Sequence, residues 1–239
     1  MHLYAEKTIL NSTITFEKID AITNEALEHF QEPFEETINK IDIFYYIYGL
    51  LHSKEYRTKY ANNLMKQLPR IPRMKTFDVF NKFKTAAEKL AHLHLHFDDF
   101  NDLKIPNYEK YLTIHKDAEN YEVSKIEYAK FDKSEGKKGN ANLDKSKIIY
   151  NNFIRIENIP AAVQEYIVNK KSALDWIVER CCVKQDKDSQ IVNNFNDYCK
   201  EIGNPKYIYQ LIINVIYISL ESVRIINNLP SLEIYEKDL

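Results

Sequence analysis

Apolar positions recur at helical spacing over most of this chain of 239 residues. The pattern predicts helices over 24–30, 42–68, 76–96, 164–168, 172–181 and 204–228. Thr23 is a candidate N-cap for the first helix and Ser172 for the fifth. Asp42 is the candidate N-cap for the second helix, which we expect to break near His52. Pro69 and Pro72 end the second helix, because proline lacks the N–H that a helix interior needs.

Two stretches in the middle of the chain are typical of strands. Residues 123–131 alternate between apolar and polar positions, and residues 147–156 are rich in β-branched and aromatic side chains. Between them, 132–144 predicts a hairpin loop, and 183–196 predicts a polar loop. We therefore predict an α+β fold, mainly helical with a small central antiparallel sheet.

Length and composition fit a cytoplasmic protein of one large domain or two small ones. The three cysteines include no CxxC pair, which fits a reducing compartment. The chain does not open with a signal peptide, and the most apolar run, 207–220, is too short to span a membrane. We expect no membrane association.

The net charge of −2 hides a strong asymmetry along the chain. Residues 1–52 hold three cations and nine anions, whereas residues 53–90 hold ten cations and three anions, a net charge of +7. Two solvated faces that attract each other would explain this pattern, and so would a surface for nucleic acid. In the basic segment, Tyr60, Asn62, Asn63 and Gln67 stand among the cations, a mixture suited to phosphates and base edges.

Sequence signatures for nucleotide binding and catalysis are missing. The chain has no GxxxxGK[ST] or GxGxxG run, no methyltransferase motif and no evident nuclease triad. His92 and His96 share a helical face near Asp99, but a third metal ligand is not apparent, so we expect structural histidines. We predict no catalytic residue, no metal ligand and no cofactor.

Several segments resemble the C-terminal specificity domain of type ISP restriction-modification enzymes, which are single polypeptides. One of them is Lys171-Ser172-Ala173-Leu174-Asp175-Trp176-Ile177. The others are 42–53, 55–57, 60–61, 68–72, 90–95, 159–160, 166–169, 179–180, 186–194 and 204–208. In that family a nuclease, a motor ATPase, a coupler and an adenine methyltransferase precede this domain. The resemblance implies that the chain recognises double-stranded DNA for these partner domains and does not catalyse.

The expected division is an N-terminal extension (1–21), a target recognition domain (22–230) and a C-terminal tail (231–239). We predict that the cations of the basic segment and those of the 132–144 loop and its edge contact DNA: Arg57, Lys59, Lys66, Arg70, Arg73, Lys75, Lys133, Lys137, Lys138 and Lys145. One alternative is a helical protein-interaction module that docks on the motor or methyltransferase without touching DNA. A third hypothesis is a small hydrolase that uses His94 and a carboxylate.

Overall fold

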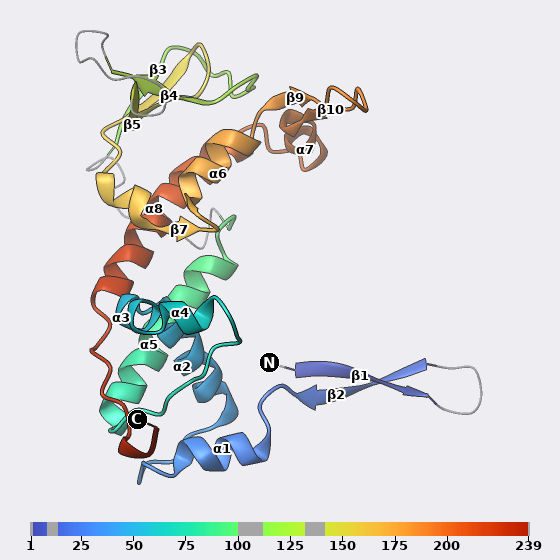
Figure 1. The fold of residues 1–239 in the computed structure, drawn as a ribbon. Helices are drawn as coiled ribbons and strands as arrows, with labels where there is room; N and C mark the ends of the chain where they lie inside the picture. The colour runs from blue at the N-terminus through green and yellow to red at the C-terminus, as the bar shows by residue number, and fades with distance from the viewer. Residues whose placement is uncertain (1, 9–13, 100–111, 132–141, 239) are drawn as a thin grey trace. The chain divides into compact units, whose positions relative to one another are not determined.

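The chain folds into two compact units, residues 1–92 with 225–239 (unit 1) and residues 93–224 (unit 2). The computed structural model describes residues 2–8, 14–99, 112–131 and 142–238 (Figure 1). Helices predominate, together with one small four-stranded antiparallel sheet, which confirms the predicted fold class. The division of the chain at 21/22 and 230/231 stays a prediction. The two compact units are separated at 92/93 and 224/225 and do not test these boundaries.

Unit 1 combines a two-stranded hairpin with a set of packed helices. The hairpin pairs β1 with β2 in antiparallel register, from His2 opposite Asp20 to Thr8 opposite Ile14. The elements are β1 (His2–Thr8), β2 (Ile14–Asp20), α1 (Asn24–Gln31), α2 (Lys40–His52), α3 (Lys54–Lys59), α4 (Ala61–Leu64), most of α5 (Phe77–Leu95) and the short 3₁₀ helix η5 (Glu236–Asp238).

The core of unit 1 is aromatic and lies where α2 meets α5. Tyr46 stacks on Phe80 with ring centroids 4.7 Å apart, and both side chains are buried. Gly49 allows the close approach of these helices, since a Cβ there would lie 2.5 Å from the carbonyl oxygen of Phe83. The helix pair therefore depends on a residue without a side chain at this crossing.

The C-terminal residues belong to the packing of unit 1. Ile234 is buried and forms an antiparallel bridge with Met74. The Lys75 N–H donates to the Glu233 carbonyl at 2.7 Å, and the Tyr235 N–H donates to the Arg73 carbonyl at 2.9 Å. Residues 233–235 thus extend along the connector between α4 and α5.

Unit 2 contains the sheet, in the strand order β3-β6-β5-β4. Its elements are β3 (Thr113–Lys116), β4 (Glu127–Lys130), β5 (Leu143–Ile149), β6 (Ile154–Glu157), the 3₁₀ helix η4 (Ala161–Glu165), β7 (Ile167–Val168), β8 (Lys171–Ser172), α6 (Ala173–Arg180), β9 (Val183–Gln185), β10 (Val192–Asn194), α7 (Phe195–Glu201) and most of α8 (Tyr207–Asn227).

The core of unit 2 joins this sheet to α6 and α8. Ile148, Ile154 and Ile156 from the sheet lie in one buried cluster with Leu174 and Ile212 from the helices. By length and composition α8 is apolar enough to cross a membrane, but 67% of its most apolar window is buried inside the protein. Its apolar surface therefore serves the core of the fold.

Three helix predictions are confirmed at their capped ends. Thr23 caps α1 by accepting the Ala26 N–H at 3.2 Å, and Ser172 caps α6 by accepting the Asp175 N–H at 3.0 Å. The expected break near His52 is the N-cap Ser53, whose hydroxyl accepts the Tyr56 N–H of α3.

The N-cap of α2 corrects the prediction that Asp42 caps this helix. Asn39 is the cap, and Asp42 stands three positions later, where its carboxylate accepts the Asn39 N–H at 2.9 Å. The two residues form a capping box, so the N-cap lies three residues earlier than the predicted one.

The predicted strand over 147–156 is two strands, β5 and β6. They are separated by a turn in which the Asn151 side chain accepts the N–H groups of Phe153 and Ile154. This Asx-type turn reverses the chain within a continuous run of strand-forming residues. Strand β3 lies in a region whose pattern is irregular and was not predicted.

Two further predictions fail at short elements. The predicted helix over 164–168 is the 3₁₀ turn η4 followed by strand β7. The predicted polar loop over 183–196 is mainly the hairpin β9–β10, followed by the start of α7. The Asp186 side chain organises the hairpin loop by accepting the Asp188 and Ser189 N–H groups, and Gln190 has a φ of 59°.

Candidate nucleic-acid interface

A groove of about 570 Å³ in unit 1 is lined by α3, α4 and the connector that follows them. Its polar and charged lining consists of His29, Tyr56, Lys59, Tyr60, Asn63, Gln67, Arg70 and Asp238. Lys59 Nζ lies 5.5 Å from the Tyr60 ring centroid, a cation–π distance. The groove thus brings together cations, amides and an aromatic ring from residues 59–70.

The connector wall of the groove is fixed by two tyrosine hydroxyls. Tyr56 donates to the Arg70 carbonyl at 2.6 Å, and the buried Tyr46 donates to the Pro72 carbonyl at 2.5 Å. Burial raises the pKa of Tyr46 well above its usual value, so it remains a neutral donor. These two bonds anchor the connector backbone at Arg70 and Pro72.

The charge of this segment is uniformly positive. Residues 56–75 contain six cations and no Asp or Glu. Among the groove residues that the structure describes, the single carboxylate is Asp238, and it is neutralised by Arg73. An anionic ligand would therefore meet no uncompensated carboxylate in the groove lining.

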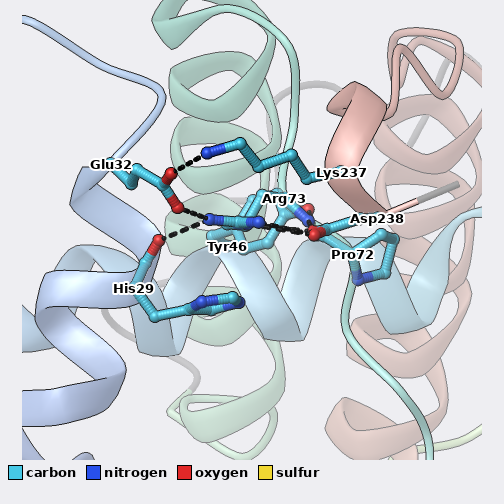
Figure 2. A network of polar contacts seen from close by, with 7 residues as sticks. All are labelled: His29, Glu32, Tyr46, Pro72, Arg73, Lys237 and Asp238. Carbon is cyan, nitrogen blue, oxygen red and sulfur yellow. Dashed lines mark hydrogen bonds and ion pairs between the residues drawn. The ribbon is translucent and has the colours of Figure 1, made fainter.

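Arg73 is the centre of a polar network with His29, Glu32, Lys237 and Asp238 (Figure 2). Its side chain is 3% exposed. Arg73 Nη2 lies 2.7 Å from Asp238 Oδ1, and Arg73 Nε lies 3.0 Å from Asp238 Oδ2. Arg73 Nη1 donates to Glu32 Oε2 at 2.5 Å and to the His29 carbonyl at 3.1 Å. Lys237 also pairs with Glu32, so the network joins α1, the connector and the C-terminal segment.

The network is electrostatically matched. Hydrogen bonds from Arg73 lower the pKa of Asp238, and those from Lys237 and Arg73 lower the pKa of Glu32. The pKa of Arg73 is raised chiefly by its hydrogen bonds to Asp238. Every charged atom of Arg73 is thus directed at protein atoms, which makes it a structural residue, and the hypothesis that it contacts DNA is not carried forward.

The remaining cations predicted in the basic segment lie at the surface. Arg57, Lys59, Lys66 and Arg70 are all exposed. Lys75 is also exposed, and its Nζ lies 3.7 Å from a carboxylate oxygen of Glu236. Only Lys59 and Arg70 of this set line the groove.

The second predicted cluster is only partly visible. Lys133, Lys137 and Lys138 lie outside the described residues. Lys145 lies on β5, where its Nζ is 2.7 Å from Asp175 Oδ2 and 5.4 Å from the Tyr128 ring centroid. Burial opposes ionisation of Asp175, but the hydrogen bonds from Lys145 and Tyr128 outweigh it and lower the pKa. Lys145 therefore already ties the sheet to α6.

The histidine run has structural contacts. His94 Nε2 lies 2.9 Å from the Tyr166 hydroxyl and 3.1 Å from the Ser222 hydroxyl, and its ring stacks on Tyr166. Among the described residues, no three His, Cys, Asp or Glu side chains are grouped as metal ligands. The hypothesis of a hydrolase that uses His94 and a carboxylate stays a prediction.

Sequence reasoning missed a cationic surface on unit 2. A cleft of about 700 Å³ is lined by five lysines, Lys125, Lys130, Lys145, Lys171 and Lys184, and by three carboxylates, Glu127, Asp175 and Glu179. Beside it, β7 and β8 are joined by only two residues, Asn169 and Lys170. This turn was not predicted. Asn169 is a turn-forming residue, but lysine in the second position is a poor signal for a two-residue turn.

Comparison with known proteins identifies the family. Residues 1–211 match the family model of the type ISP C-terminal specificity domain. The fold is similar to part of LlaBIII, an ATP-dependent type ISP restriction-modification enzyme whose structure is bound to DNA, with a TM-score of 0.78 and 32% identity over 98% of this chain. It is also similar to part of a nuclease-deletion mutant of the type ISP enzyme LlaGI in complex with a DNA substrate mimic, with a TM-score of 0.69 and 37% identity over 84% of this chain.

A third structure, of DrdV in complex with DNA, has a TM-score of 0.69 at 24% identity over 93% of this chain, and shares the fold. No curated protein sequence matches the chain significantly. The matched part is 14% of the LlaBIII chain and 17% of the LlaGI chain, so this chain spans less than a fifth of either. The match to the family model and the likeness to LlaBIII and LlaGI agree, and the chain belongs to the family of type ISP C-terminal specificity domains.

Proposed function

We propose that this chain recognises the DNA target sequence of a type ISP restriction-modification enzyme, and that the groove of unit 1 is part of its DNA-facing surface. The observation that carries the proposal is the coincidence of two facts. The chain is a specificity domain by family, and a groove in unit 1 is lined mainly by a 20-residue segment without a single carboxylate.

The lining of the groove suits duplex DNA chemically. Lys59 and Arg70 can neutralise phosphates, while the amides of Asn63 and Gln67 match the donor and acceptor pattern of an adenine edge. Lys66 and Arg57 extend the positive surface beyond the groove. Phosphate contacts would position the domain, and the amides would supply part of the sequence preference.

Catalysis belongs, in this proposal, to the partner domains of the same system: the nuclease, the motor and the adenine methyltransferase. The chain alone would then neither methylate nor cleave DNA, and it would bind neither S-adenosylmethionine nor ATP. We expect its affinity for DNA to be low, with a Kd of about 10⁻⁴ to 10⁻⁶ M. The reason is that the duplex would be held between this domain and the methyltransferase, and the chain alone supplies only one of these two sides. The function also places the protein in the cytoplasm with the DNA.

A module that only docks on the motor or methyltransferase is not favoured. Docking on protein would not require a carboxylate-free run of cations around a groove that also presents two amides. Protein interfaces are instead depleted of lysine relative to the rest of the surface.

Salt dependence of DNA binding tests the proposal. The Lys59→Gln/Arg70→Gln variant removes two groove cations, whereas the Lys82→Gln/Lys200→Gln control removes two exposed lysines that already face carboxylates. In a titration with a short mixed-sequence duplex, the slope of log K against log salt should fall by about 2 in the groove variant. The control should keep the slope of the parent. Equal slopes for the two variants would contradict the assignment of the groove to DNA.

A further inference from the structure

We propose that Lys170, at the tip of the β7–β8 hairpin of unit 2, contacts a DNA phosphate and gives the domain a second point of attachment. The inference rests on the proposed function, but it concerns a different surface from the groove. It is carried by a backbone conformation that lysine rarely adopts, by the rigid mounting of the hairpin and by the local charge.

The hairpin tip is conformationally costly. Val168 pairs with Lys171, so Asn169 and Lys170 form a two-residue loop. Their φ angles are 49° and 72°, both in the region that a type I′ turn requires. Asparagine tolerates this region, but the second position normally holds glycine, because a Cβ there crowds the backbone. Lysine at this place therefore works against the stability of the turn.

The fold gives no packing reason for this lysine. Lys170 is exposed, and its side chain has no hydrogen bond or ion pair with any other described residue. A residue that costs conformational energy and packs against nothing is typical of a functional position.

The hairpin presents Lys170 from a fixed position. Trp176 of α6 donates from Nε1 to the Val168 carbonyl at 2.7 Å, which holds the strand against the helix. The Ala173 N–H donates to the Tyr166 carbonyl at 3.0 Å, and Lys171 Nζ lies 5.0 Å from the Trp176 ring centroid. Because the tip is already ordered, binding there would cost little conformational entropy.

The surroundings of the tip favour an anion. Glu179 pairs with Lys171 and also lies in the field of Arg180 and Lys184. These three cations act on one carboxylate, which leaves a net charge of +2 before Lys170, the sequence neighbour of Lys171, is counted. The other carboxylate of α6, Asp175, is taken up by Lys145. A nucleic-acid phosphate fits this surface, and lysine is suited to it as a point charge.

Opposite effects on stability and binding test the proposal. In the Lys170→Gly variant the turn gains its preferred residue, so Tm should equal that of the parent or exceed it by up to about 4 °C. The same change removes one phosphate contact, so the slope of log K against log salt, measured with a short mixed-sequence duplex, should fall by about 0.9. Lys170→Asn should reproduce the loss in slope, because asparagine tolerates the turn but carries no charge.

The matched control is Asn169→Gly, which changes the neighbouring turn residue and keeps the charge; its slope should equal that of the parent. If Lys170→Gly and Lys170→Asn both bind DNA with the slope of the parent, the proposal is overturned while the proposed function stands. If both variants lower Tm, the lysine has a structural role and the proposal is also overturned. If the parent itself shows no salt-dependent DNA binding, the proposed function fails first.

Discussion

Replacing Arg73 by methionine tests whether this cation stabilises the fold, in contrast to the neighbouring cations that we expect to contact DNA. The change keeps an unbranched apolar stem but removes a guanidinium that is 3% exposed and that donates to Asp238, Glu32 and the His29 carbonyl. Asp238, whose side chain is 14% exposed, would keep its charge and lose its main partner. The loss should therefore resemble the breaking of a buried ion pair.

Breaking a buried pair costs about 3–5 kcal/mol, and we expect the lower end because Glu32 is 42% exposed and can be solvated. For a chain of this size, about 3 kcal/mol corresponds to a decrease in Tm of about 6–12 °C. The assay is thermal unfolding followed by circular dichroism, together with hydrogen exchange in α1 and in residues 229–238, which the network joins. Both segments should lose protection.

The matched control is Arg70→Met, three residues away on the same connector. Arg70 is exposed, so its replacement should change stability by no more than about 0.5 kcal/mol and should instead weaken DNA binding. If the Arg73 and Arg70 variants unfold at the same temperature and lose DNA binding equally, the division between structural and DNA-facing cations is wrong.

Two further predictions concern the packing and charge of unit 1. Gly49→Ala places a Cβ 2.5 Å from the Phe83 carbonyl oxygen and should destabilise the fold by about 1–3 kcal/mol in urea unfolding, and unchanged stability would argue against the close crossing of α2 and α5. The lowered pKa values of Asp238 and Glu32 stabilise the fold above their ordinary pKa values and lose that effect as the pH falls through the lowered ones. Parent stability should thus decline below about pH 4, and Arg73→Met should show a shallower decline in the same pH series.

Local signals predicted the helices and their starts well where a cap stood beside a long apolar pattern. Thr23 and Ser172 were found because a side-chain oxygen in the right place fixes a helix end by short-range hydrogen bonds. Asn39 was missed because its capping role depends on Asp42 as a reciprocal partner. We predicted β5 and β6 as one strand over 147–156, because only the Asn151 side chain marks the turn between them.

The candidate site could be predicted where its cations stand close together in the sequence. Lys59 and Arg70 line a groove on the segment that the sequence marks as basic. Arg73 resembles these cations in the sequence. It is structural because the fold brings it into contact with Asp238, which is 165 residues away in the chain. Lys170 was overlooked because its significance lies in a positive φ, which composition does not reveal.

Exchange of this domain into LlaBIII is the most direct test of the central claim. The aligned segment of that enzyme, similar at a TM-score of 0.78, would be replaced by this chain, and the modified sites of DNA exposed to the hybrid would be read by sequencing. We expect the hybrid to modify a sequence different from that of LlaBIII, and to lose this preference when Lys59 and Arg70 are both changed to glutamine. Modification of the original LlaBIII sequence by the hybrid would contradict the claim that this chain carries target recognition.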